Sequence, residues 1–246
     1  MEQQTSFYTS TTRYNATLPS KPRKESAKMR TARLYNLHLV NQSSCAGKRG
    51  MPLLNPELVI PDSLIGFNYA KSASEKTGGV HFFLDDYQYE RVWARMESYV
   101  EVLSRFDCVL TPDFSLYLDM PLRMQAWNIY RSRACGHYWQ SEGIKVIPTI
   151  SWSCEESYGF CFEGVPEGSV IAVSTVGVKR NADARYYWRA GMSEAIKRTK
   201  PACVLLYGGN IGYDFGDTPY KEYANQNVER MKTQKNRLQE QIEWKE

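Results

Sequence analysis

Residues 108–117 read CVLTPDFSLY, and they begin as an apolar run that stops at Pro112. An apolar run without polar alternation is typical of a strand buried on both faces, as found in parallel sheets covered by helices. Pro112 cannot donate a hydrogen bond to a neighbouring strand, so it ends the run. Asp113 follows at once. The stretch therefore predicts a buried strand with a carboxylate at its carboxyl end.

Further runs of the same kind occur along the chain and alternate with helical patterns. They lie at residues 65–70, 80–85, 145–152, 169–176 and 202–207. Apolar residues repeat at helical spacing in 87–106 and 120–142, and helices are also expected at 182–199 and about 219–242. Asp119 and Pro121 suit the start of the second helix and Gly143 its end. Strands that alternate with helices favour an α/β fold with a parallel sheet.

The connections between the runs decide between two kinds of parallel sheet. Residues 71–79 are too few for a full crossover helix, and residues 153–168 leave room for a short helix at most. The glycine fingerprint of dinucleotide-binding folds does not follow an early strand. We therefore expect an irregular or incomplete (β/α) barrel-like parallel sheet with helical cover, rather than an open doubly wound sheet.

The N-terminal segment differs in composition from the rest of the chain. Residues 1–33 are rich in Ser, Thr, Lys and Arg and show no apolar period. Nine of the Lys and Arg residues, against two Glu, fall in the first 50 residues, although the whole chain carries only +4. We expect a basic flexible arm at 1–33 and a single α/β domain at 34–246. Residues 34–40, LYNLHLV, could form a first strand.

Cysteine usage and hydropathy exclude several classes of protein. The six cysteines are scattered through 246 residues and form no Cys-x-x-Cys pair, unlike the frameworks of small secreted domains. The first residues lack the apolar core of a signal peptide, and no apolar run reaches the ~18 residues of a membrane span. These features predict reduced thiols, a cytoplasmic location and no membrane partner.

Polar or small residues recur where the strand-like runs end. Because the carboxyl ends of parallel strands form the ligand-binding edge, these residues are the best candidates for a site. Asp113 and Asp85 are the catalytic candidates, since carboxylates from two strands could transfer protons or hold a divalent cation. The ligand-binding candidates are Ser151, Trp152, Tyr207, Gly208 and Gly209.

Each of these residues also has a structural interpretation. Asp and Ser are common at strand ends as turn formers and helix caps. The segment YGGNIG, 207–212, could present amides to a phosphate, but a flexible turn is the alternative. Asp86 and Glu90 fit the first turn of a helix. The three histidines lie far apart, so no metal site is predicted, and nothing identifies a cofactor.

The basic arm is a second candidate for function. Positive charges cluster at Lys21, Arg23, Lys24, Lys28, Arg30 and Arg33, with Glu25 as the opposing charge. Such a cluster can bind the backbone of a nucleic acid by releasing counterions, although a solvated tail would look the same. RYYW at 185–188 could be an exposed stacking patch or part of a helix docked on the sheet.

Three segments carry a resemblance to a known family. DDYQYERVW at 85–93, the long block TPDFSLYLDMPLRMQAWNIYRSRACGHYWQSEGIKVIPTISW at 111–152, and IAVSTVGV at 171–178 resemble the domain of unknown function 4417 family. The match runs from about residue 65 to 209. The resemblance implies an origin in bacteria, phages or other mobile elements and a cytosolic setting, and it supplies no activity.

Two function hypotheses follow, together with a variant of the second. In the first, a polar pocket at the strand ends binds a small polar or nucleotide-like ligand, and the protein could be a hydrolase or lyase. In the second, a non-enzymatic accessory protein contacts nucleic acid through the basic arm. In the variant, an aromatic surface recognises a host protein.

Overall fold

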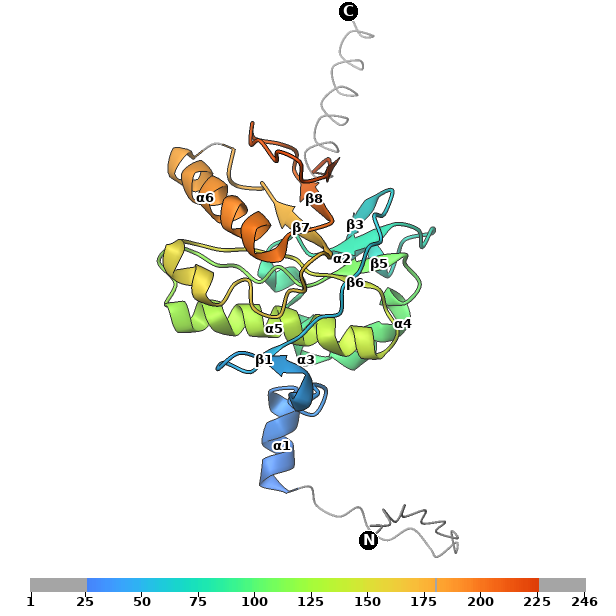
Figure 1. Ribbon diagram of the computed structural model, residues 1–246. Helices are drawn as coiled ribbons and strands as arrows, with labels where there is room; N and C mark the ends of the chain where they lie inside the picture. Colours follow the sequence, from blue (N-terminus) through green and yellow to red (C-terminus); the bar gives the residue numbers. More distant parts are fainter. Residues whose placement is uncertain (1–25, 180, 226–246) are drawn as a thin grey trace, which may run out of the picture.

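The computed structural model describes residues 26–179 and 181–225 of the chain (Figure 1). In this part of the chain the strands are short, and most of their residues are buried. They are β1 (Cys45–Ala46), β2 (Met51–Pro52), β3 (Leu64–Gly66), β4 (Gly79–His81), β5 (Cys108–Leu110), β6 (Val146–Ile147), β7 (Val170–Ser174), β8 (Cys203–Tyr207) and β9 (Tyr220–Tyr223).

Two long helices and several short ones surround the strands. The long ones are α5 (Leu122–Ser141) and α6 (Ala182–Thr199), which confirm the helices expected at 120–142 and 182–199. The short ones are α1 (Ala27–Leu34), η1 (Gln42–Ser44), α2 (Phe67–Ala70), η2 (Asp86–Gln88), α3 (Glu90–Ala94), η3 (Met96–Tyr99), α4 (Val100–Leu103) and η4 (Glu155–Gly159).

Seven strands run parallel and neighbour one another in chain order. Four form a sheet in the order β3-β4-β5-β6, and three form a second sheet in the order β7-β8-β9. A parallel bridge between Thr149 and Ala172 joins the two sheets. The fold is therefore α/β with parallel strands and helical cover, as the alternating pattern predicted.

The strand array is strongly curled. Seven flat strands would place the first and last roughly 29 Å apart, at about 4.8 Å per neighbour. Instead, the Tyr223 hydroxyl in β9 donates a hydrogen bond to the carbonyl of Pro61, just before β3, at 2.5 Å. The Lys221 ammonium donates to the same carbonyl at 2.8 Å. The described strands include no backbone pairing of β9 with β3, so a closed barrel is not shown.

Side chains on the concave side of this array form one core. It draws on six of the seven strands and on Phe83, which follows β4. It consists of Leu64, Phe83, Cys108, Leu110, Ile147, Val170, Ala172, Cys203, Leu205, Tyr207 and Tyr223. The intervening residues, such as Val80, Val109 and Ile171, belong to two other cores that lie under the helices. Burial on both faces explains why the strands read as continuous apolar runs.

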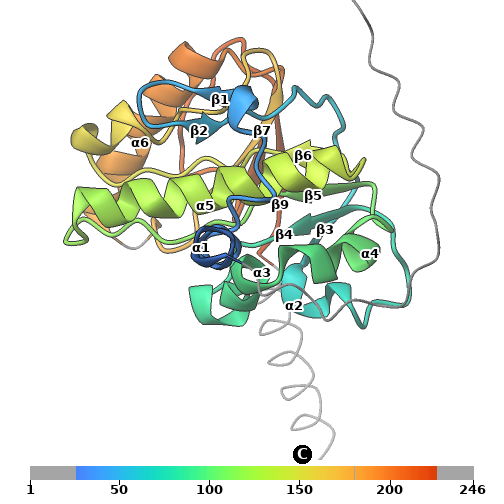
Figure 2. The same cartoon turned by 90° about the horizontal axis from the view of Figure 1, so that it is seen from below.

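The helices lie on the outer side of the array (Figures 1 and 2). Seen from below in Figure 2, α5 crosses the middle of the molecule, with α2, α3 and α4 along one flank and the β1–β2 hairpin along the other. Helix α6 covers β7 and β8. These helices do not cover the loops at the carboxyl ends of the strands, so these loops can form a site.

Several predicted elements differ from the structure. The strand expected at 34–40 is absent from the described structure: Leu34 ends α1, and residues 35–40 form turns and bends. Asn36 adopts φ +55°, and its side-chain amide donates to the Trp93 carbonyl at 2.6 Å. The strand expected at 65–70 ends at Gly66 and continues as α2. The helix expected at 87–106 is broken into short pieces, since Arg95 leaves helical geometry at φ −146°, ψ 50°.

The two ends of the described chain also differ from expectation. Ala27–Leu34 form α1, with the Ser26 hydroxyl capping the helix at the Met29 amide, where no regular structure was predicted. Residues 220–223 are strand β9 rather than helix, because pairing with β8 overrides a thin helical stripe. The remainder of the expected arm, at 1–25, and of the expected final helix, at 226–242, lies outside the described residues.

All six cysteines fall in the described ranges, and each is a free thiol there. Among the helices of those ranges, none combines the length and apolar character that a bilayer crossing requires.

Candidate functional site

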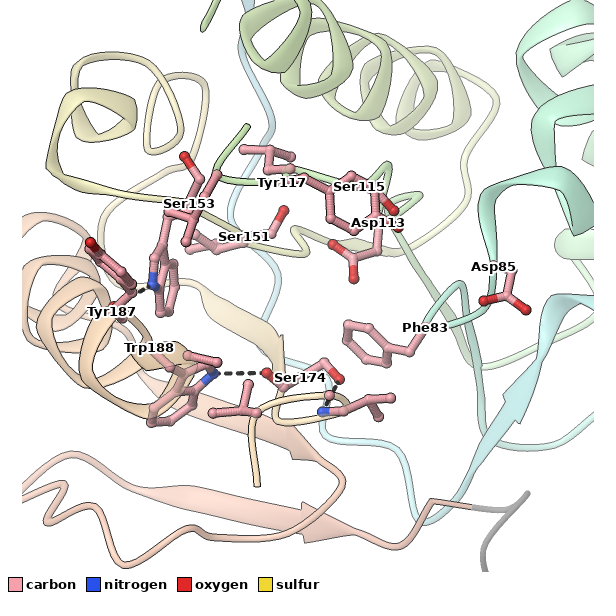
Figure 3. Close-up of a pocket in the computed structure, with 18 of the residues that line it drawn as sticks. Phe83, Asp85, Asp113, Ser115, Tyr117, Ser151, Ser153, Ser174, Tyr187 and Trp188 are labelled. Carbon is pink, nitrogen blue, oxygen red and sulfur yellow. Dashed lines mark hydrogen bonds between the residues drawn. The ribbon is translucent and has the colours of Figure 1, made fainter. Parts of the chain in front are cut away.

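A cavity of about 710 Å³ opens at the carboxyl ends of the parallel strands (Figure 3). Its walls come from the segments that follow β4, β5, β6 and β7, and from the first turns of α6. One wall residue from each of these five parts of the chain is, in order, Phe83, Asp113, Ser151, Ser174 and Trp188. The structure therefore brings the ends of several strands together at one cavity, as predicted.

Asp113 is the most deeply set ionisable group of this cavity. Its side chain is only partly exposed, and the Ser151 hydroxyl lies near its carboxyl. Removal of the carboxyl from water raises the pKa of Asp113 to about 7, and the nearby Asp86 charge acts in the same direction. The nearby Ser151 hydroxyl and the Arg133 charge oppose the shift. Asp113 can therefore carry or lack a proton near neutral pH.

Hydrogen bonds to the Asp86 carboxylate fix the loop that carries Asp113. One Asp86 carboxylate oxygen accepts the Ser115 hydroxyl at 2.7 Å and the Tyr89 hydroxyl at 3.1 Å. The Ser115 amide donates to the same carboxylate at 3.2 Å. The Tyr89 hydroxyl also contacts the Asp113 carbonyl oxygen. Asp86 thus has a structural role beyond the helix charge that was expected of it.

Trp152 forms a flat part of the wall, as predicted. Its indole N–H donates to the Tyr187 carbonyl at 3.0 Å. The indole lies so close to α6 that a Cβ built on Gly191 would be 2.1 Å from its Nε1 atom. A glycine at this position is required for the ring to lie against the helix.

Asp85 lines the same cavity but is not a close partner of Asp113. It is exposed at the rim, and Figure 3 shows it on the far side of Phe83 from the Asp113 carboxyl. The hypothesis of two carboxylates acting together therefore has no support from their placement. The chain turns at Leu84, where the Leu84 amide donates to the Phe82 carbonyl, so Asp85 no longer follows the strand.

Tyr207, Gly208 and Gly209 are not among the residues of the cavity wall. Tyr207 is buried in the inner core, where its ring contacts His81 at 4.3 Å and Phe83 at 5.0 Å between centroids. Gly208 and Gly209 adopt φ +98° and +81°, which identifies them as turn formers. The next amide, that of Asn210, donates to the Glu222 carboxylate at 3.1 Å, so this amide is not available to a phosphate.

Several wall residues escaped the sequence interpretation. Ser174 ends β7, and its carbonyl accepts the Trp188 indole N–H at 2.8 Å. Within RYYW, Tyr187 and Trp188 line the cavity and Tyr186 is exposed, so the segment is mainly a docked helix. Phe83 follows β4 on the inner face. The alternation of strand faces could have identified Phe83 and Ser174, whereas the helix could not be placed without its neighbours.

Arg133 on α5 was missed because a charged residue in a helix is normally exposed. It is fully buried, and its guanidinium donates to the carbonyls of Thr149, Cys161 and Glu163 at 2.9, 3.0 and 3.1 Å. Burial lowers the pKa of Arg133 to about 10. It ties α5 to the segment after β6 that carries Ser151, and so it positions the cavity.

The chemistry of the cavity depends on Asp113 and the hydroxyl beside it. A carboxyl with a pKa near 7 can give a proton to a bound group or take one from it. In the described ranges, no cluster of three or more His, Cys, Asp or Glu side chains has the arrangement of a metal site.

The basic cluster proposed for nucleic acid is only partly described. Lys21, Arg23 and Lys24 lie outside the described residues. Lys28, Arg30 and Arg33 are exposed on α1, which has no buried residue and extends from the body of the molecule (Figure 1).

Comparison with known proteins places the chain among phage sequences. It is 41% identical to "Gene 1 protein" of Mycobacterium phage L5 over 194 residues, which cover 77% of this chain and 84% of the relative. It is 40% identical to "Gene 1 protein" of Mycobacterium phage D29 over 178 residues, which cover 71% of this chain and 65% of that relative. No solved structure gives a significant match. Residues 44–224 match the family described as Domain of unknown function (DUF4417), and the chain belongs to that family.

Proposed function

We propose that this protein binds a small polar ligand in the cavity at the strand ends and exchanges a proton with it through Asp113. The observation that carries the proposal is the desolvated Asp113 carboxyl, which lines a cavity of about 710 Å³ together with Ser151. Carboxyls with strongly raised pKa values cluster at functional sites, because desolvation without full compensation costs stability. The incomplete barrel formed by the curled strands would serve as the scaffold.

The proton exchange fits a hydrolase or lyase. The protonated carboxyl would donate to a leaving group, and the ionised form would take a proton from water or from a carbon or hydroxyl of the ligand. The nearby Ser151 hydroxyl would orient the carboxyl. Asp85 at the rim would contact the outer part of the ligand.

A ligand screen with matched variants tests the proposal. The wild type, Asp113→Asn and Asp217→Asn would be screened by thermal shift against sugars, nucleosides, nucleotides, amines and divalent metals. Asp217 is exposed and does not line the cavity, which makes it a matched control. We expect at least one class to stabilise the wild type and the control but not Asp113→Asn. Equal shifts in all three proteins for every class would refute a role for Asp113.

A second candidate function is nucleic-acid binding through α1. It is favoured by the exposed cations of α1, a helix that contributes nothing to the cores of the described domain. The test is salt-dependent binding of DNA and RNA by the full chain, compared with a triple charge reversal at Lys28, Arg30 and Arg33. Reversal of the exposed Lys48, Lys71 and Lys145 is the control.

Loss of binding in the α1 variant alone, with a smaller salt slope, would support this candidate. Binding that survives the α1 reversal, or that falls equally in the control, would exclude α1 as the contact.

A further inference from the structure

The charges around the cavity are all of one sign. Its described wall includes Asp85, Asp113 and Asp119, and no Lys, Arg or His side chain. Arg133 influences Asp113 through space, but it is fully buried, and its guanidinium is occupied by three main-chain carbonyls. A phosphate or carboxylate entering this cavity would meet carboxylates without a described cation to pair with it.

Many hydrogen-bond donors of the wall are already engaged within the protein. The indole N–H groups of Trp152 and Trp188 donate to main-chain carbonyls. The Ser115 hydroxyl donates to Asp86, and the Ser153 hydroxyl donates to the Gln125 amide oxygen at 2.6 Å. These four donors are therefore occupied within the protein, whereas the carboxylates of the wall can accept hydrogen bonds from a ligand.

Aromatic rings form a further part of the wall. Phe83, Trp152, Tyr187 and Trp188 line the cavity together with Tyr117. In Figure 3 the side chains of Tyr187, Trp188 and Phe83 stand around the space below Ser151 and Asp113. The face of an aromatic ring attracts a cation, and the attraction strengthens when the cation is desolvated.

We infer that the ligand of this cavity is an organic cation, with an ammonium, amidinium or guanidinium group directed toward Asp113 and an apolar or planar part against the aromatic wall. This inference rests on the proposed function and narrows its ligand class. It excludes nucleotides and other anionic compounds from the possible ligands, and it retains amines and amidines. A free small molecule and the side chain of a Lys or Arg in a peptide share this chemistry.

Binding of such a cation depends on the ionisation of Asp113. The described charges around it are Asp86 from η2, Arg133 from α5, and Asp85 and Asp119 at the rim, with the Tyr89 hydroxyl at its carbonyl. The cation favours the ionised carboxyl, so it must displace the proton when Asp113 is protonated. Affinity should rise about tenfold per pH unit up to about pH 7 and then level off.

Three probes with the same ring and different charge test the inference. Benzamidine is a planar cation, benzamide is its neutral isostere, and benzoate is an anion. Their binding to the full chain would be measured by titration calorimetry between pH 5.5 and 8.5, with Asp113→Asn and Asp217→Asn as the variant and its control. We expect benzamidine to bind at least about tenfold more tightly than benzamide at pH 8, with no binding of benzoate.

In Asp113→Asn the preference for benzamidine and its pH dependence should both disappear, whereas Asp217→Asn should behave as the wild type does. A blocked arginine peptide, compared with agmatine, would show whether the cation comes from a peptide or from a free molecule.

Several outcomes would overturn the inference. They are equal binding of benzamide, tighter binding of benzoate, a preference for benzamidine that survives in Asp113→Asn, or no binding of benzamidine at millimolar concentration. A neutral or anionic compound whose binding needs Asp113 would reject the cation while leaving the proposed function intact. Failure of the proposed function itself would appear as binding of every screened class without dependence on Asp113.

Discussion

Arg133 and Asp113 are two ionisable residues beside the segment that follows β6, and they differ in how far the protein satisfies their hydrogen bonds. Arg133 has no exposed surface, and its guanidinium donates to three main-chain carbonyls. Asp113 is desolvated yet borders an open cavity, with the Ser151 hydroxyl nearby. The first charge is satisfied by the protein, whereas the second is only partly compensated.

This difference separates a structural charge from a candidate functional one. A buried charge whose hydrogen bonds are complete holds the fold together and has nothing left to offer a ligand. A desolvated carboxyl beside a cavity keeps capacity for a further partner, and desolvation raises its pKa. The comparison predicts large stability losses at Arg133 and stability gains at Asp113.

The largest expected effect is that of Arg133→Met. The change leaves three buried carbonyls without their donor, so it should lower the free energy of unfolding by about 3–5 kcal/mol. Urea unfolding followed by circular dichroism would measure it. Arg105→Gln, which removes an exposed ion pair with Glu101, should cost less than about 1 kcal/mol. Equal losses in the two variants would contradict the structural role of Arg133.

Gly191→Ala should come next. The added Cβ would meet the Trp152 indole at 2.1 Å, so the ring must leave its place against α6. We expect a loss of about 2–3 kcal/mol together with weaker ligand binding. Gly168→Ala is a control for backbone strain, since Gly168 has φ +72° and an added Cβ would have nothing within 4 Å. Retained ligand affinity in Gly191→Ala would show that Trp152 is not needed in the wall.

Asp113→Asn should stabilise the protein at high pH. The folded-state pKa is raised to about 7, so the unfolded chain loses its proton first, and wild-type stability falls as pH rises from about 4 to 7. The variant has no ionisable carboxyl at this position, so its stability does not fall for this reason as pH rises. It should be more stable than the wild type by about 1–2 kcal/mol at pH 8 and equal to it near pH 3.5, as measured by thermal unfolding across pH. A destabilised variant at pH 8 would assign Asp113 to the structural class.

Asp86→Asn is expected to have the smallest effect on stability. The amide keeps one acceptor for the Ser115 hydroxyl and loses the charge, at a cost of about 1 kcal/mol. Because the Asp86 charge helps to raise the pKa of Asp113, the variant should shift the titration of Asp113 to lower pH. Carboxyl NMR shifts would report it. An unchanged titration would leave desolvation as the sole cause of the raised pKa.

The sequence determined the local elements and the edge of the sheet at which a site would form. Continuous apolar runs identified the strands β5, β7 and β8, because burial on both faces leaves no place for polar residues. Helical periodicity, together with a cap or a glycine at the ends, identified α5 and α6. Asp113, Ser151 and Trp152 were found from their positions at strand ends, since parallel strands share one carboxyl edge.

The tertiary structure alone decided which of these residues share the cavity and which do not. Pairing with β8 turned residues 220–223 into a strand, and the curl of the array brought Tyr207 into the inner core under Phe83. Long-range contacts also buried Arg133 and raised the pKa of Asp113. Local periodicity records which face of an element is apolar, but desolvation and charge depend on neighbours that are distant in sequence.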